Sequence, residues 1–170
     1  MSNKPIFDEL LVTCATELFR ARGFELRRTS DLDTPIEYAA IIGFASDEVR
    51  GMLGLGMYPS TLERLASKHA GSAASLEDWL GECVNQLLGR LKNKLLSYDV
   101  VITLALPTVL RGVHLRFLAT GPAGLWTYSF DSDGGPICVW CDVRHAEGLV
   151  LVPSSDPELK STDEGELLLF

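Results

Sequence analysis

The chain has 170 residues, the length of one ordinary domain, and its composition of 46% hydrophobic and 22% charged residues can form a buried core. Asp and Glu number 23 against 15 Lys and Arg, and the formal charge of -8 argues against binding to nucleic acid or to an anionic membrane surface. The longest apolar run, residues 100–110, is too short to span a membrane. Asp8 and Glu9 interrupt the N-terminal segment where a signal peptide would be apolar, so we expect a cytoplasmic protein.

The first half of the chain begins with a predicted helix over residues 5–22. Its apolar residues recur at spacings of three and four, Pro5 lies in the first turn, and Gly23 follows the last turn. Strand-like segments follow at 24–30, 36–46 and 48–58, and the last two are separated by a Ser-Asp-Glu turn. A short helix over residues 59–70 completes this half.

The segment from 75 to 97 predicts the longest helix. Ser75 and Asp78 fit a capping box, with Asp in place of the usual Glu or Gln. Apolar residues cover about half of the helix circumference at roughly 100° per residue, and they are Leu76, Trp79, Leu80, Cys83, Val84, Leu87, Leu88, Leu91 and Leu95. Five strand candidates follow, broken by Gly, Pro and Asp-Gly turns, at 100–107, 113–119, 125–130, 137–143 and 148–153.

This order of elements predicts an α+β fold: a two-layer sandwich in which long helices pack on one face of a largely antiparallel sheet. We expect the folded domain to occupy residues 1–153. Residues 154–170 are polar and acidic and form a predicted C-terminal tail. The tail ends in Leu-Leu-Leu-Phe, which could dock on its own domain or on a partner subunit.

The four cysteines do not predict a metal site or a disulfide framework. Cys14 and Cys83 lie on the apolar faces of predicted helices and are expected in the core. Cys138 and Cys141 form a C-x-x-C pair within a predicted strand, where residues three apart point to opposite faces. We therefore expect ordinary packing at these positions.

One stripe of the helix over 75–97 carries unusual residues for a solvated face. Asp78, Glu82, Asn85 and Gly89 lie within about 60° of arc, opposite the centre of the apolar face. Gly81 and Gly89 flank the polar line, although a glycine inside an exposed helix costs about 1 kcal/mol relative to alanine. The stripe is either a plain solvated face or a surface that another molecule approaches closely.

The pattern Asp78-x-x-x-Glu82-x-x-Asn85, followed by Pro107, resembles the active helix of the CheC/CheX/FliY family of chemotaxis phosphatases. The 21 residues between Asn85 and Pro107 are one fewer than in the family pattern. The order of elements over residues 5–152 is also similar to this family. Because the chain has one such helix rather than two, it resembles the CheX-like branch.

The resemblance implies a phosphatase that hydrolyses the aspartyl phosphate of a CheY-type receiver domain. It makes Glu82 and Asn85 the catalytic pair: Asn85 positions the attacking water, and Glu82 forms a salt bridge to a lysine of the receiver. It implies no cofactor or metal of the chain's own, with Mg²⁺ held by the receiver. Gly81 and Gly89 would then permit close approach of the partner, and Asp78 would either bind the partner at the rim of the site or simply favour the N-terminus of the helix through its dipole. Beside the stripe, Gln86 and Asn93 are expected to be solvated.

Two other functions fit the sequence. The chain could be a non-catalytic CheX-like adaptor that binds a receiver or another signalling protein, which the tail and the shortened spacing favour. It could also be a structural dimer module without a receiver partner. In each case we expect a homodimer, because the late strands are apolar and an exposed sheet edge would otherwise aggregate.

Overall fold

The computed structural model describes residues 3–30, 36–68, 75–118 and 125–154. The predicted tail lies almost entirely outside the described residues. The elements, in chain order, are α1 (Lys4–Ala21), β1 (Arg27–Thr29), β2 (Ile36–Ala45), β3 (Val49–Met57), α2 (Pro59–Ser67), α3 (Leu76–Leu96), β4 (Thr103–Leu104), β5 (Thr108–Leu115), β6 (Trp126–Asp131) and β7 (Ile137–His145).

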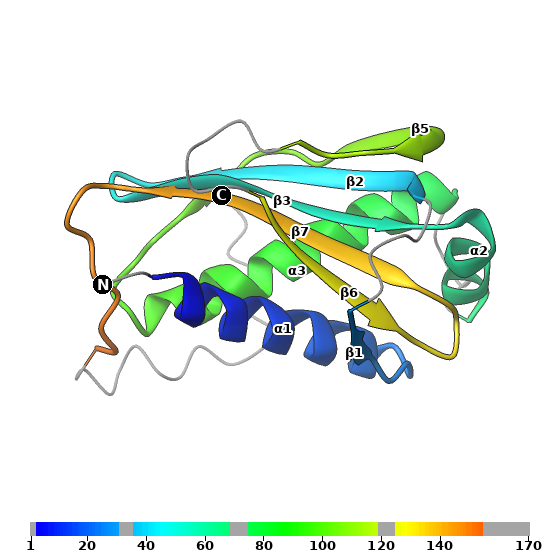
Figure 1. The fold of residues 1–170 in the computed structure, drawn as a ribbon, viewed down its shortest axis with the longest axis horizontal. Helices are drawn as coiled ribbons and strands as arrows, with labels where there is room; N and C mark the ends of the chain where they lie inside the picture. Colours follow the sequence, from blue (N-terminus) through cyan, green and yellow to red (C-terminus); the bar gives the residue numbers. More distant parts are fainter. Residues whose placement is uncertain (1–2, 31–35, 69–74, 119–124, 155–170) are drawn as a thin grey trace.

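The fold has two layers, with α1 and α3 packed side by side on one face of the sheet and α2 at one end (Figure 1). The main core lies between the layers. From α1 the core includes Phe7, Leu11 and Leu18, which recur at helical spacing on one face of the helix. On β3, Leu53 and Leu55 alternate with outward-facing residues. The two-layer α+β prediction is confirmed.

The described strands form one sheet in the order β1-β6-β7-β3-β2-β4, and β5 also pairs with β2. All pairings are antiparallel. β2 pairs with β3 along one side, while β4 and then β5 occupy the other side. Ser46 closes the β2–β3 turn: its backbone N–H donates to the Val49 carbonyl oxygen at 2.7 Å, which confirms the predicted Ser-Asp-Glu turn.

The late part of the chain differs from the sequence-based prediction in three places. The strand expected over 100–107 is reduced to two residues, and the strand expected over 113–119 begins earlier, at Thr108, immediately after Pro107. The segment 148–153 forms no strand. Asn3 takes the place of a neighbouring strand there, since its side-chain amide donates to the Leu149 carbonyl oxygen and accepts from the Leu151 N–H.

The sheet face opposite the helices carries a second, smaller apolar cluster built on Trp140. The Trp140 indole lies against Gly54 and Gly56 of β3, so that a Cβ added at Gly54 would meet the ring at 1.9 Å. Phe117 covers the indole in a stacked arrangement, with ring centroids 3.9 Å apart. The two glycines therefore make the space in which this tryptophan is buried.

Replacing Gly54 by alanine should destabilise the protein by roughly 1–3 kcal/mol, because the indole must leave its place. Gly43→Ala is the matched control on the neighbouring strand: an added Cβ there makes only ordinary contacts, with the Ala105 Cβ at 3.6 Å and the Gly51 carbonyl oxygen at 3.9 Å. Urea unfolding of both variants measures the difference. Equal stabilities for the two variants would contradict the close packing of Trp140 on Gly54.

Candidate functional site

The longest helix presents a continuous polar face. Ser75 caps α3, and its hydroxyl oxygen accepts a hydrogen bond from the Asp78 backbone N–H at 3.0 Å, which confirms the role of Ser75 in the predicted capping box. Asp78, Glu82 and Asn85 are all exposed on the side of α3 turned away from the core. Nothing within the described part of the domain covers these three side chains, so a partner molecule can reach them.

The carboxylate of Glu82 is held by a neighbour on the same helix. Gln86 donates from Nε2 to Glu82 Oε1 at 2.6 Å, and Gln86 Oε1 in turn accepts from Arg22 Nη2 at 2.5 Å. Gln86 is exposed, as expected, but it also bridges two helices. The spacing of four residues between Glu82 and Gln86 was the available signal for the first bond. No sequence signal pointed to Arg22.

The two glycines of the stripe have different surroundings. Gly81 is buried, and an added Cβ would lie 3.4 Å from the Val109 side chain of β5. Gly89 is half-buried, and an added Cβ would meet no atom within 4 Å. Close packing within the domain therefore accounts for a small residue at position 81, whereas the fold itself gives no reason for glycine at position 89.

Pro107 comes immediately before β5, the strand whose second residue packs on α3 through Gly81. It has no backbone N–H and therefore cannot continue the ladder that β4 begins against β2. The pairing along this side of β2 is therefore interrupted at Pro107, between β4 and β5. Because β5 packs on α3 at Gly81, the segment around Pro107 lies on the same side of the domain as the start of the polar stripe.

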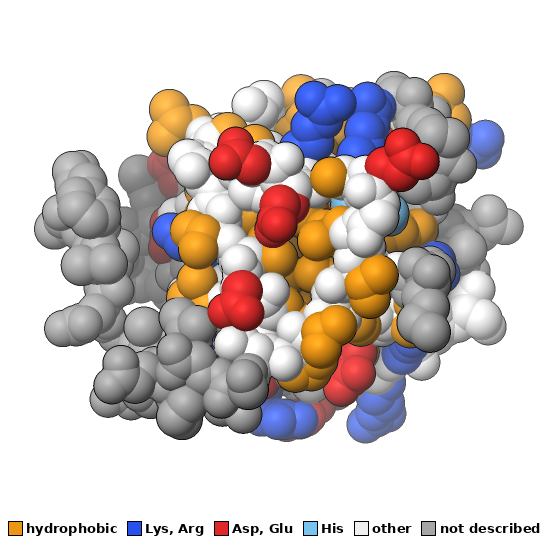
Figure 2. Space-filling view, turned by 90° about the vertical axis from the view of Figure 1, so that its left-hand side faces the viewer, with side chains coloured by type: hydrophobic (Ala, Val, Ile, Leu, Met, Phe, Trp, Pro, Cys, Tyr) orange, Lys and Arg blue, Asp and Glu red, His pale blue; other side chains and the backbone are white. Residues whose placement is uncertain are grey.

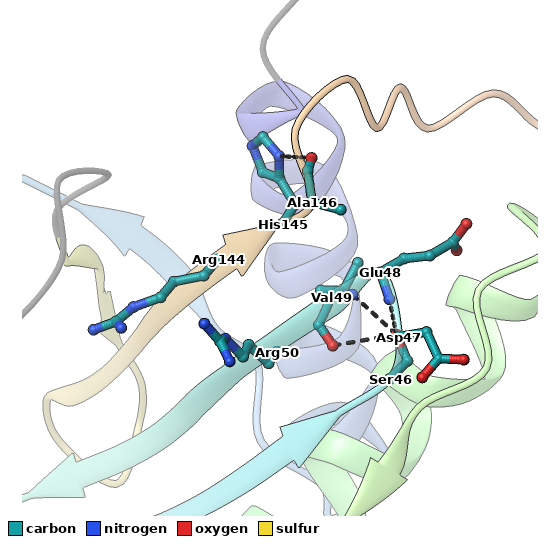
Figure 3. Close-up of a pocket in the computed structure, with 8 residues that line it drawn as sticks. All are labelled: Ser46, Asp47, Glu48, Val49, Arg50, Arg144, His145 and Ala146. Atoms are coloured by element: carbon teal, nitrogen blue, oxygen red, sulfur yellow. Dashed lines mark hydrogen bonds between the residues drawn. The ribbon is translucent and has the colours of Figure 1, made fainter.

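A separate hollow of about 310 Å³ lies at the other end of the sheet, over the β2–β3 turn and the end of β7. Arg50 and Arg144 extend to one side of it and His145 to another (Figure 3). Figure 2 faces this end of the molecule, where hydrophobic side chains are exposed between charged ones. The hollow contains none of the stripe residues, and we place the candidate site on α3.

The cysteines lie where the sequence predicted. Burial raises the pKa of the Cys14 and Cys83 thiols to about 12. Cys141 belongs to the main core and Cys138 packs against the cluster on the opposite sheet face, which confirms that the C-x-x-C pair is divided between faces. Among the described residues no group of His, Cys, Asp and Glu is arranged to hold a metal ion.

Comparison with known proteins identifies relatives of this fold. A family model described as chemotaxis phosphatase CheX matches residues 38–130, more than half of the chain. No curated protein sequence matches the chain. No helix in the described segments has both the length and the apolar character required to cross a membrane.

Solved structures agree with the family match. The chemotaxis protein CheX from Vibrio vulnificus is 15% identical, with a TM-score of 0.70 over 80% of this chain and 95% of that chain. A CheC-like superfamily protein from Shewanella sp. PV-4 is 15% identical, with a TM-score of 0.69 over 81% and 97%. A chain of the CheX–CheY–BeF3–Mg²⁺ complex from Borrelia burgdorferi is 19% identical, with a TM-score of 0.65 over 81% and 97%. At such identities the likeness establishes the fold.

The open space at Gly89 predicts that Gly89→Ala will stabilise the protein by about 1 kcal/mol, because alanine loses less conformational freedom in a helix. For a chain of this size the melting temperature should rise by roughly 2–4 °C. Gly81→Ala is the control on the same helix, where contact with Val109 should reduce the gain. A lower melting temperature for Gly89→Ala would contradict the open space around position 89.

Proposed function

We propose that this chain, which belongs to the CheX family of chemotaxis phosphatases, hydrolyses the aspartyl phosphate of a CheY-type receiver domain. One observation carries the proposal: Glu82 and Asn85 are both exposed, three residues apart, on the polar face of α3. The similarity to a chain of the CheX–CheY complex from Borrelia burgdorferi supports a receiver as the partner. The sequence contains this Glu-x-x-Asn pattern once.

The reaction is attack by water on phosphorus. The bond between phosphorus and the acyl oxygen of the receiver's aspartate breaks, which releases inorganic phosphate and restores the carboxylate. An acyl phosphate is already reactive, so the phosphatase needs chiefly to position the water in line. The amide of Asn85 suits this role because its oxygen accepts from the water, its nitrogen donates, and it carries no charge to repel the phosphoryl group.

Glu82 has a different role, in binding and orientation. Its carboxylate lies one turn before Asn85 on the same face of α3 and forms the proposed salt bridge to the receiver's lysine. Charge complementarity of this kind fixes the register of two proteins as they associate. Mg²⁺ belongs to the receiver in this proposal, and the chain's own residues contribute one carboxylate and one amide.

Asp78 and Gly89 are proposed to contact the receiver, and Gly81, which is buried within the domain, is proposed to act indirectly. Asp78 lies in the first turn of α3, where its charge favours the positive end of the helix and can also accept hydrogen bonds from a partner. Gly89 leaves space above the helix for the receiver's loops. Gly81 contributes by letting β5 pack closely on α3, which sets the shape of the surface that the receiver meets.

Asn85→Ala should abolish the acceleration of phosphate release while leaving receiver binding almost unchanged, because only the water-positioning group is lost. Glu82→Ala should instead raise KM by roughly tenfold, as expected for the loss of one hydrogen-bonded charge pair. The measurement is inorganic phosphate released from Mg²⁺-loaded, phosphorylated receiver domains over a range of receiver concentrations. Asn93→Ala, an exposed asparagine two turns further along α3, is the matched control.

Two outcomes would change the conclusion. If no receiver loses phosphate faster but one is captured by the wild-type chain, the polar face is a binding surface and the chain acts as an adaptor. If a receiver loses phosphate equally fast with Asn85→Ala, the catalytic group lies elsewhere.

Gly89→Ala should raise the KM for the phosphorylated receiver if the receiver approaches α3 closely at this position, in spite of the greater stability of the variant.

We also propose a homodimer formed along β5. This strand pairs with β2 on one side only, and its other side is an edge among the described strands. Apolar side chains are exposed along and beside it: Leu106 is 88% exposed, Val113 79% and Leu118 84%. An apolar edge of this kind favours pairing with a second strand, and pairing of two copies about a two-fold axis satisfies both edges.

Val113→Lys should convert the dimer to a monomer, because it places a charge on the apolar edge. Size-exclusion chromatography with light scattering measures the mass directly. Val101→Lys is the control, since Val101 is also exposed, at 64%, but lies outside β5. A monomeric wild type, or a dimer that survives Val113→Lys with its mass unchanged, would contradict an interface along β5.

A further inference from the structure

A chain of two hydrogen bonds connects the end of α1 to the carboxylate of Glu82. Arg22 Nη2 donates to Gln86 Oε1 at 2.5 Å, and Gln86 Nε2 donates to Glu82 Oε1 at 2.6 Å. All donors and acceptors run in one direction, from the guanidinium through the amide to the carboxylate. Hydrogen bonds in series polarise one another, so the cation strengthens the bond that the amide makes to Glu82.

The arginine that begins this chain is itself fixed. Arg22 is the C-cap residue of α1. Its Nη1 donates to the Leu18 carbonyl oxygen at 3.3 Å, and its guanidinium lies 6.0 Å from the centroid of the Trp79 ring on α3. These contacts join the guanidinium to both helices. The orientation of Gln86 is therefore set by the packing of α1 against α3 rather than by the side chain alone.

The neutral amide of Gln86, which lies between the charges of Arg22 and Glu82, keeps the arginine from pairing with the carboxylate. If Arg22 paired directly with Glu82, the arginine would compete with any cation that the partner brings to this carboxylate. Through Gln86, the arginine fixes the position of one carboxylate oxygen without touching it. Among the described residues Glu82 makes no other side-chain bond, so its second oxygen, Oε2, remains available to a partner.

We propose that Gln86 and Arg22 are positioning residues for Glu82 in the reaction with the phosphorylated receiver. They hold Oε1 so that Oε2 meets a cationic group of the receiver in a fixed geometry, which lowers the entropy that Glu82 loses on binding. This inference rests on the proposed function of the polar face. It gives α1 a part in that function, although α1 carries no residue of the Glu82–Asn85 motif.

The test is the kinetics of phosphate release by the full chain with Gln86→Leu, which keeps the size of the side chain and its helix propensity but removes both hydrogen bonds. KM should rise about 3- to 10-fold, the range expected for the loss of one hydrogen bond of ordinary strength at an exposed site, while kcat changes less than twofold. Arg22→Met should have a similar effect, and the double variant should show no further increase. Asn93→Leu makes the same kind of substitution elsewhere on α3 and should leave KM unchanged.

A double-mutant cycle separates positioning from a general structural effect. In a Glu82→Ala background, Gln86→Leu should leave KM unchanged, because the carboxylate that it positions is absent. An unchanged KM for Gln86→Leu alone, or an equal rise in KM in both backgrounds, would overturn the inference while leaving the proposed function intact. Absence of phosphate release by the wild type from every receiver would instead overturn the proposed function, and this inference with it.

Discussion

Burial of the apolar face of α3 against the sheet is the interaction on which the rest of the structure depends. Leu80, Val84, Leu87, Leu88 and Leu91 are completely buried in the main core, and burial of each such side chain contributes about 1.5–3 kcal/mol. A helix is rigid about its axis, so anchoring one face also fixes the direction of the opposite face. The polar stripe is therefore held toward solvent by the core beneath it.

The candidate site is chemically sparse, and in the proposed reaction the receiver supplies both the reactive group and the metal. It consists of a carboxylate and an amide one turn apart, and no group of His, Cys, Asp and Glu among the described residues is arranged to hold a metal ion. Its organisation lies in how these groups are held. Glu82 accepts a hydrogen bond from Gln86, and Gln86 accepts one from Arg22. The packing of α1 against α3 therefore sets the position of the exposed Glu82 carboxylate.

The sheet carries apolar side chains both on its outer face and at its edge. Glycines in β3 allow Trp140 to lie flat on the strand and be covered by Phe117, so the outer face is closed by the domain's own residues. The opposite situation holds at β5, where Val113 on the strand and Leu118 just beyond its end are exposed. One apolar surface is covered within the chain, and the other is the edge at which we propose that a second copy pairs.

The sequence by itself determined the features that depend on local periodicity: the bounds of α3, its Ser75 cap, the opposite faces of Cys138 and Cys141, and the position of Glu82 and Asn85 opposite the apolar face of α3. Only the tertiary structure decided the features that depend on distant segments. Asn3 replaces a strand beside Leu149, β5 begins at Thr108 rather than at position 113, and Arg22 reaches Gln86 from another helix. The physical reason is that a side chain's direction follows from its own helix or strand, whereas its partner is set by packing between elements far apart in the chain.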